Sequence, residues 1–189
     1  RLDAGHPELV LTGINIGTYR DPESGARLGD LVRVLGRLDG LARLRISSIE
    51  PGDITDDLLG AMAETPTVGP HMHIPLQSGA PAVLAAMRRS YTLDDYLDAC
   101  RRARAALPGV NLTTDAIVGF PGEDEDAFLG TARVAEELGM SKVHVFPYSP
   151  RPGTAAADMP GRPEPDVLRE RSARLRDLSD RLGFAHRMA

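Results

Sequence analysis

One stretch of the sequence decides the fold: Val110-Asn111-Leu112-Thr113-Thr114-Asp115-Ala116-Ile117-Val118, then Gly119-Phe120-Pro121-Gly122 and four acids at 123–126. Apolar and β-branched residues favour a strand over 110–118, and the glycines and proline end it. The four acids stand where the N-terminus of a helix favours negative charge. The stretch therefore predicts a strand, a turn and the start of a helix, which together form the repeating unit of parallel α/β folds.

The same alternation of short apolar segments and longer helical ones recurs along the chain. Strands are predicted at Leu9 to Ile14, Leu44 to Ser48, His71 to Pro75, Val110 to Val118 and Lys142 to Pro147. Each is followed by a segment of helical period, so the fold class is α/β with parallel strands. Five such strands in about 150 residues suit an open doubly wound sheet or part of a (β/α) barrel, and periodicity does not choose between them.

Two helices have clear boundaries in the sequence. One covers Thr92 to Leu107, because Thr92 and Asp95 have the spacing of a capping box before an apolar stripe. Cys100 lies on that stripe and is predicted to be a buried core residue. The other helix covers Val167 to Leu182 and follows a linker marked by Pro160, Pro163 and Pro165.

The composition narrows the class of protein. The 189 residues carry a formal net charge of -5, which excludes a broad basic surface for nucleic acid. No apolar run reaches the roughly 18 residues of a membrane helix. Residues 1–7 contain no apolar export segment, so a cytoplasmic setting without a membrane partner is expected. The single cysteine, Cys100, allows neither an internal disulfide nor, by itself, a metal cluster.

Polar residues and glycines gather where the predicted strands end. In chain order these ends carry Thr12, Gly13 and Asn15, then Ser48 and Glu50, then Gln77 and Ser78, then 115–123, and finally 148–151. The carboxyl ends of parallel strands meet at one edge of a sheet, and helix N-termini there offer free N–H groups. The pattern predicts a site for a polar organic ligand.

Six ordered motifs resemble those of the radical S-adenosylmethionine (SAM) methylthiotransferases. They are Leu11 to Gly17, Arg45 to Pro51, His71 to Gly79, Met87 to Thr92, Thr114 to Glu123 and Val145 to Thr154. The similarity covers nearly the whole chain. Within the family, His71 to Gly79 and Tyr148 to Arg151 look most like the enzymes that act on N6-threonylcarbamoyladenosine in tRNA.

This resemblance implies a fold and a chemistry. Residues 1–160 would form the second to sixth strands of a (β/α)6, TIM-like radical SAM barrel whose first strand is missing, and 161–189 a linker and the last helix. A [4Fe–4S] cluster would cleave SAM reductively, and the resulting radical would take hydrogen from C2 of the modified adenine before sulfur and methyl are added. The implied cofactors are SAM and two [4Fe–4S] clusters, and the implied partners are tRNA and an electron-donor protein.

The resemblance also carries SAM-binding roles onto the strand ends. Thr12, Gly13 and Asn15 would bind the methionyl amino group of SAM. Ser48 and Glu50 would bind its ribose or its amino group, and Arg89 would bind its carboxylate. Ile117 to Gly119 would pack against the adenine. The full predicted set is Thr12, Gly13, Asn15, Ser48, Glu50, Gln77, Ser78, Arg89, Asp115, Ile117, Val118, Gly119 and Tyr148. No catalytic residue and no metal ligand is identified.

One departure from the family is an absence. Its cluster is held by three cysteines in a C-x3-C-x2-C loop after the first barrel strand, and this sequence has only Cys100. We therefore expect a fragment of a larger enzyme, without the N-terminal domain for the auxiliary cluster and the C-terminal RNA-binding domain. Such a fragment alone is expected to be inactive.

Other functions stay open at this stage. Within the family, the substrate could be isopentenyladenosine in tRNA or an aspartate of a ribosomal protein. Outside this activity, the chain could be an inactive remnant that only binds a partner or RNA. A zinc-dependent barrel hydrolase is a weaker alternative, in which His71, His73, Asp115 and Glu50 would supply the ligands.

Overall fold

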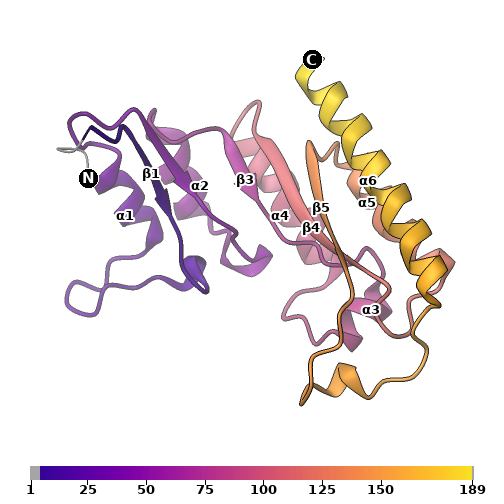
Figure 1. Ribbon diagram of the computed structural model, residues 1–189. Helices are drawn as coiled ribbons and strands as arrows, with labels where there is room; N and C mark the ends of the chain where they lie inside the picture. Colours follow the sequence, from indigo (N-terminus) through magenta and orange to yellow (C-terminus); the bar gives the residue numbers. More distant parts are fainter. Residues whose placement is uncertain (1–4, 189) are drawn as a thin grey trace. The chain divides into compact units, whose positions relative to one another are not determined.

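The computed structural model describes residues 5–188, which form two compact units (Figure 1). Unit 1 contains residues 5–74 and 97–111, and unit 2 contains residues 75–96 and 112–188. Residues 1–4, which belong to the segment inspected for an export signal, lie outside the described residues. The two units are described separately below.

Unit 1 is built around two parallel strands. Its elements are β1 (Glu8–Leu11), η2 (Ile16–Thr18), α1 (Leu28–Leu35), β2 (Arg43–Ile46), η3 (Pro51–Asp53), α2 (Asp56–Glu64), β3 (His71–His73) and most of α4 (Leu93–Ala106). β1 and β2 pair in parallel from Glu8 opposite Arg43 to Leu11 opposite Ile46. Because side chains alternate along a strand, Leu44 and Ile46 face the buried side while Arg43 and Arg45 face outward.

Unit 2 repeats the parallel arrangement with longer strands. Its elements are α3 (Pro81–Ala86), β4 (Asn111–Val118), α5 (Glu125–Glu137), β5 (Lys142–Pro147), η4 (Ala155–Ala157) and α6 (Pro165–Met188), with the first turn of α4. β4 and β5 pair in parallel from Thr113 opposite Lys142 to Val118 opposite Pro147. In Figure 1, α6 runs along β5. It approaches closely because Ser179 Oγ accepts a hydrogen bond from the Val143 N–H at 3.0 Å.

Local capping explains where several helices begin. At α4, Asp95 Oδ2 accepts from Thr92 N at 2.8 Å, and Thr92 Oγ1 accepts from Asp95 N at 3.2 Å, which confirms the predicted capping box. Cys100 is fully buried on this helix, as predicted. At α5, the Asp124 carboxylate accepts from Ala127 N at 2.8 Å.

The structure confirms the predicted strands and corrects some of their limits. The strand pairs β1–β2 and β4–β5 are both parallel, and an isolated bridge between Arg20 and Arg27 is antiparallel. The first strand ends at Leu11 rather than Ile14, because the chain leaves the sheet and turns into η2. Pro165 is the first residue of α6 rather than part of the linker, since a proline fits the first turn of a helix. A continuous row of barrel strands stays a prediction.

Candidate functional site

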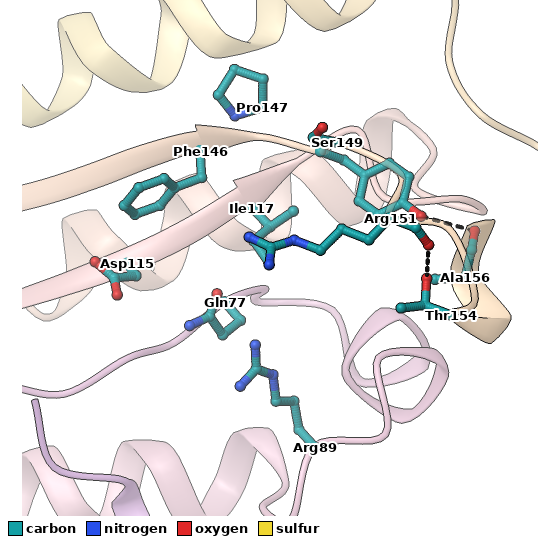
Figure 2. A pocket seen from close by; sticks show the side chains of 11 residues that line it. Gln77, Arg89, Asp115, Ile117, Phe146, Pro147, Ser149, Arg151, Thr154 and Ala156 are labelled. Atoms are coloured by element: carbon teal, nitrogen blue, oxygen red, sulfur yellow. Dashed lines mark hydrogen bonds between the residues drawn. The ribbon is translucent and has the colours of Figure 1, made fainter. Parts of the chain in front are cut away.

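The carboxyl ends of β4 and β5 open onto a cavity of about 580 Å³ in unit 2 (Figure 2). Its lining comes from both strands, the segment after β5 and the chain before α4. The lining residues are Gln77, Arg89, Asp115, Ile117, Phe146, Pro147, Tyr148, Ser149, Arg151, Thr154 and Ala156. Five of them, Gln77, Arg89, Asp115, Ile117 and Tyr148, belong to the set predicted from the sequence. The edge of the sheet at which polar residues were expected is therefore hollow in this unit.

Gln77 has an unusual backbone at the wall of this cavity. Its φ angle is 64°, in the left-handed region that a side chain rarely adopts. Two hydrogen bonds to β4 hold it there: Gln77 N donates to Asp115 O, and Ile117 N donates to Gln77 O, both at 2.9 Å. The carboxamide points toward the cavity in Figure 2. Backbone strain of this kind is common at ligand sites, where it fixes the direction of a side chain.

A buried network of hydrogen bonds supports the turn that follows β4. Gly119, with φ at 80°, donates its N–H to Glu123 Oε1 at 2.9 Å. Arg171 of α6 donates from Nη1 to the backbone oxygen of Glu123 at 3.0 Å and to its Oε1 at 3.2 Å. Burial raises the pKa of Glu123, although the Gly119 N–H and the Arg171 charge oppose that shift. Arg171 therefore compensates a carboxylate that has little access to water.

This network corrects the prediction for the acidic run at 123–126. Glu123 lies before the helix rather than in its first turn, and its side chain is only 1% exposed. Asp124 caps the helix, and the half-exposed side chain of Glu125 forms ion pairs with Arg171 and Arg174. The hydrogen bond from Arg174 is the largest cause that lowers the pKa of Glu125. Only part of the acidic run therefore complements the helix dipole.

Three predicted residues of unit 2 lie behind the cavity wall. Ser78 is fully buried, and its hydroxyl accepts a hydrogen bond from Ala80 N at 3.2 Å. The side chain of Val118 faces the core, and its carbonyl accepts from Tyr148 N at 2.8 Å. The Gly119 N–H is used by Glu123. The Val118 carbonyl and the Gly119 N–H thus both have hydrogen-bond partners within the protein, and contacts of Val118 and Gly119 with an adenine stay a prediction.

The predicted residues of unit 1 follow its own strands. Thr12, Gly13 and Asn15 are exposed between β1 and η2, and the Asn15 carbonyl accepts from Thr18 Oγ1 at 3.0 Å. Ser48 is exposed and Glu50 is half-buried between β2 and η3. A SAM-binding role for these residues stays a prediction.

The alternative of a zinc hydrolase finds no support in the described residues. His71 and His73 are half-buried on one face of β3, with buried Met72 between them. Within residues 5–188, no group of three or more His, Cys, Asp or Glu side chains could hold a metal ion. The same observation applies to an iron–sulfur cluster, because Cys100 is buried on a helix. The thiolates for a cluster are not among the residues described.

Two prominent residues of the cavity are missing from the SAM-binding set predicted from the sequence. Arg151 follows β5 in the segment that resembles the family, and Phe146 stands on β5 with half of its side chain exposed. Strand alternation could have found Phe146, because it pairs in register with Ile117. Arg151 lies in a loop, where periodicity gives no direction for a side chain.

None of the helices within residues 5–188 combines the length and the apolar character that crossing a membrane requires.

Parallel strands, helices after them and a polar cavity at the strand ends define an α/β protein of the kind that binds its ligand at the carboxyl edge of the sheet. A model of the radical SAM superfamily matches residues 6–135. That match covers more than half of the chain, so the chain belongs to the radical SAM superfamily.

Two relatives with similar sequences carry the same name. The chain is 46% identical over 188 residues to the tRNA-2-methylthio-N(6)-dimethylallyladenosine synthase of Acidothermus cellulolyticus, which covers 96% of this chain and 37% of that protein. A protein of the same name from Parafrankia sp. is 45% identical over 98% of this chain and 38% of its own length. The chain thus spans little more than a third of these relatives.

Solved structures support the fold alone. Coproporphyrinogen III oxidase from Escherichia coli, described as a radical SAM enzyme, matches with a TM-score of 0.65 and 19% identity. The match covers 91% of this chain and 40% of the other. The names of these relatives specify dimethylallyladenosine, the nucleoside of the isopentenyl alternative above, and not threonylcarbamoyladenosine.

Proposed function

We propose that this chain is part of a radical SAM methylthiotransferase that acts on N6-dimethylallyladenosine in tRNA. The observation that carries the proposal is the 46% identity to a synthase of that name over 96% of the chain. Gln77 and Tyr148, which belong to the motifs that favoured threonylcarbamoyladenosine, line a cavity where every member of the family would bind the same cofactor. These motifs are therefore poor guides to the nucleoside.

The cavity in unit 2 has groups that fit SAM. The guanidinium of Arg89 suits the carboxylate of the cofactor, and the carboxylate of Asp115 suits its ammonium group or ribose hydroxyls. Ile117 gives the wall an apolar patch for the adenine. When bound to a reduced cluster, SAM supplies the radical chemistry, and the residues of this chain bind and orient it.

Gln77 would be a positioning residue in this scheme. Its backbone is fixed by the two hydrogen bonds to β4, so the direction in which the side chain leaves the backbone is fixed as well. A carboxamide both donates and accepts, which suits a ribose hydroxyl or the edge of an adenine. Orientation by a rigid wall is the main contribution that a protein makes when a cofactor carries the hard chemistry.

The test is nucleoside mass spectrometry of tRNA from cells that lack the gene for the full-length protein. We expect the methylthio form of dimethylallyladenosine to disappear and its precursor to accumulate. The wild-type gene should restore the product, and the Gln77→Ala variant should restore less of it. Normal methylthiolation of dimethylallyladenosine, together with loss of methylthio-threonylcarbamoyladenosine, would overturn the proposed substrate.

A further inference from the structure

Arg151 occupies a loop whose base is fixed although its surface is exposed. Thr154 Oγ1 donates to the Arg151 carbonyl at 2.8 Å, and Tyr148 Oη donates to the Ala156 carbonyl at 2.8 Å. These bonds close the loop after β5 onto itself. In Figure 2 the side chain of Arg151 extends from this loop over Ile117 toward Gln77. The guanidinium is therefore directed over the cavity rather than away from it.

The charges around the cavity are unbalanced. Two guanidinium groups, those of Arg89 and Arg151, line it, while Asp115 is the only carboxylate among its lining residues. Within residues 5–188, Arg151 makes no ion pair. A planar guanidinium binds the oxygens of a phosphate or a carboxylate through paired hydrogen bonds. With Arg89 assigned to the carboxylate of SAM, the second cation indicates a second oxyanion.

An aromatic side chain lies on the same side of the cavity. Phe146 is 50% exposed on β5, directly opposite Ile117 in the strand register. Figure 2 shows its ring among the lining residues, and the loop that carries Arg151 begins two residues later. Proteins that bind single-stranded nucleic acid combine exposed aromatic rings, on which bases stack, with cations along the backbone.

We propose that Phe146 and Arg151 form a subsite for one unpaired nucleotide of the RNA substrate, in which Phe146 stacks on the base and Arg151 binds a backbone phosphate. The inference rests on the proposed function, because it takes an RNA as the substrate. It also explains how a chain with a net charge of -5 contacts RNA at one point rather than over a basic surface. The carboxylate of SAM is the other possible source of the oxyanion.

The experiment measures binding to the full-length enzyme that carries this segment. The probes are SAM and tRNA containing dimethylallyladenosine, titrated separately at several salt concentrations. The variants are Arg151→Ala, Arg151→Lys and Phe146→Leu. Arg176→Ala is the matched control, because Arg176 is an exposed arginine of α6 in the same unit and does not line the cavity. Circular dichroism verifies that every variant is folded.

We expect Arg151→Ala to weaken tRNA binding about tenfold and to reduce the slope of log K against log salt by about 0.7, the value for one phosphate of a single strand. Arg151→Lys should keep most of that slope. Phe146→Leu should weaken binding about tenfold without changing the slope, since stacking releases no counterion. Affinity for SAM should stay unchanged in all of these variants, and Arg176→Ala should behave as wild type.

Two results would overturn the subsite. If Arg151→Ala weakens SAM binding and leaves tRNA binding intact, the oxyanion is the carboxylate of the cofactor. If Arg151→Ala and Arg176→Ala give the same salt slope, Arg151 makes no phosphate contact. Failure of the proposed function is a separate outcome, because it would appear as wild-type enzyme that neither binds nor methylthiolates this tRNA.

Discussion

The two units share a plan, a parallel strand pair with helices after each strand, but they hold their polar groups differently. In unit 1, Glu8 pairs with Arg43 and Arg45 on the outer face of β1 and β2, at 3.6 and 3.8 Å, and all three side chains are at least 40% exposed. In unit 2, Arg171 pairs with Glu123 behind the turn after β4, and both side chains are nearly inaccessible. Water therefore solvates the charges of Glu8, Arg43 and Arg45, whereas the charges of Arg171 and Glu123 are compensated by each other and by hydrogen bonds within the protein.

This difference indicates which interactions hold the residues of a ligand site in place at the end of a strand. In unit 1 the residues after β1 are exposed, and a local hydrogen bond from Thr18 Oγ1 to the Asn15 carbonyl holds this segment. The strand ends of unit 2 are supported from behind by buried hydrogen bonds, such as the one from Leu76 N to Thr114 Oγ1 at 2.9 Å. A binding site is kept in its geometry by a surrounding shell of this kind. The substitutions below measure how much each unit depends on its polar groups.

The largest effect is expected from Arg171→Met in unit 2. The change leaves the buried Glu123 carboxylate without its cation, and breaking one partner of a buried pair costs about 3–5 kcal/mol. The matched control is Arg174→Met, which removes an exposed cation of α6 that pairs with Glu125 and lies over the Phe128 ring. That control should cost less than about 1 kcal/mol. Denaturant unfolding followed by circular dichroism gives both values.

The pH dependence of the stability of Arg171→Met tests whether Glu123 is responsible for the loss. Burial raises the pKa of Glu123, so the stability linked to its proton is present at low pH and is lost as the pH rises through the raised pKa. Without Arg171 the pKa rises further. The stability deficit of Arg171→Met should therefore be larger near neutral pH than at about pH 5. If the loss of stability does not change with pH, the loss does not come from a Glu123 carboxylate that lacks a neighbouring positive charge.

An intermediate effect is expected where backbones meet in unit 2. A methyl group on Gly79 would lie 2.5 Å from the backbone oxygen of Gly130 in α5, so Gly79→Ala should cost at least about 1–3 kcal/mol. Gly52→Ala is the control in unit 1, since nothing lies within 4 Å of the methyl group there. Thermal unfolding of the two variants provides the comparison. Equal shifts in Tm would contradict the close backbone contact between Gly79 and Gly130.

The sequence predicted the features that depend on neighbours along the chain. Strand positions, the capping box of α4 and the buried Cys100 follow from short-range patterns, and the structure confirms them. The pairing of Glu123 with Arg171 joins residues 48 positions apart, so no local pattern could predict it. The acidic run was accordingly assigned as a whole to the helix dipole.

The candidate site shows the same limit. Residues at strand ends could be selected by position, and four of them, Gln77, Asp115, Ile117 and Tyr148, line the cavity. Ser78 and Val118 satisfied the same rule, yet their groups are turned inward, because direction depends on the backbone conformation. The left-handed backbone at Gln77 arises from pairing with β4, which the sequence of residue 77 alone does not encode.

The smallest effect is expected from Glu8→Gln in unit 1. The substitution keeps the shape of the side chain but removes its charge from Arg43 and Arg45. Exposed ion pairs contribute about 0–1 kcal/mol, because water already solvates both partners and ordering two long side chains costs entropy. Salt screens such pairs, so the difference from wild type should shrink further as ionic strength rises. Denaturant unfolding at low and high salt measures this change directly. A loss of stability comparable to that of Arg171→Met would mean that the outer face of β1 and β2 is shielded from water in solution. The proposed difference between exposed ion pairs in unit 1 and a buried ion pair in unit 2 would then be wrong.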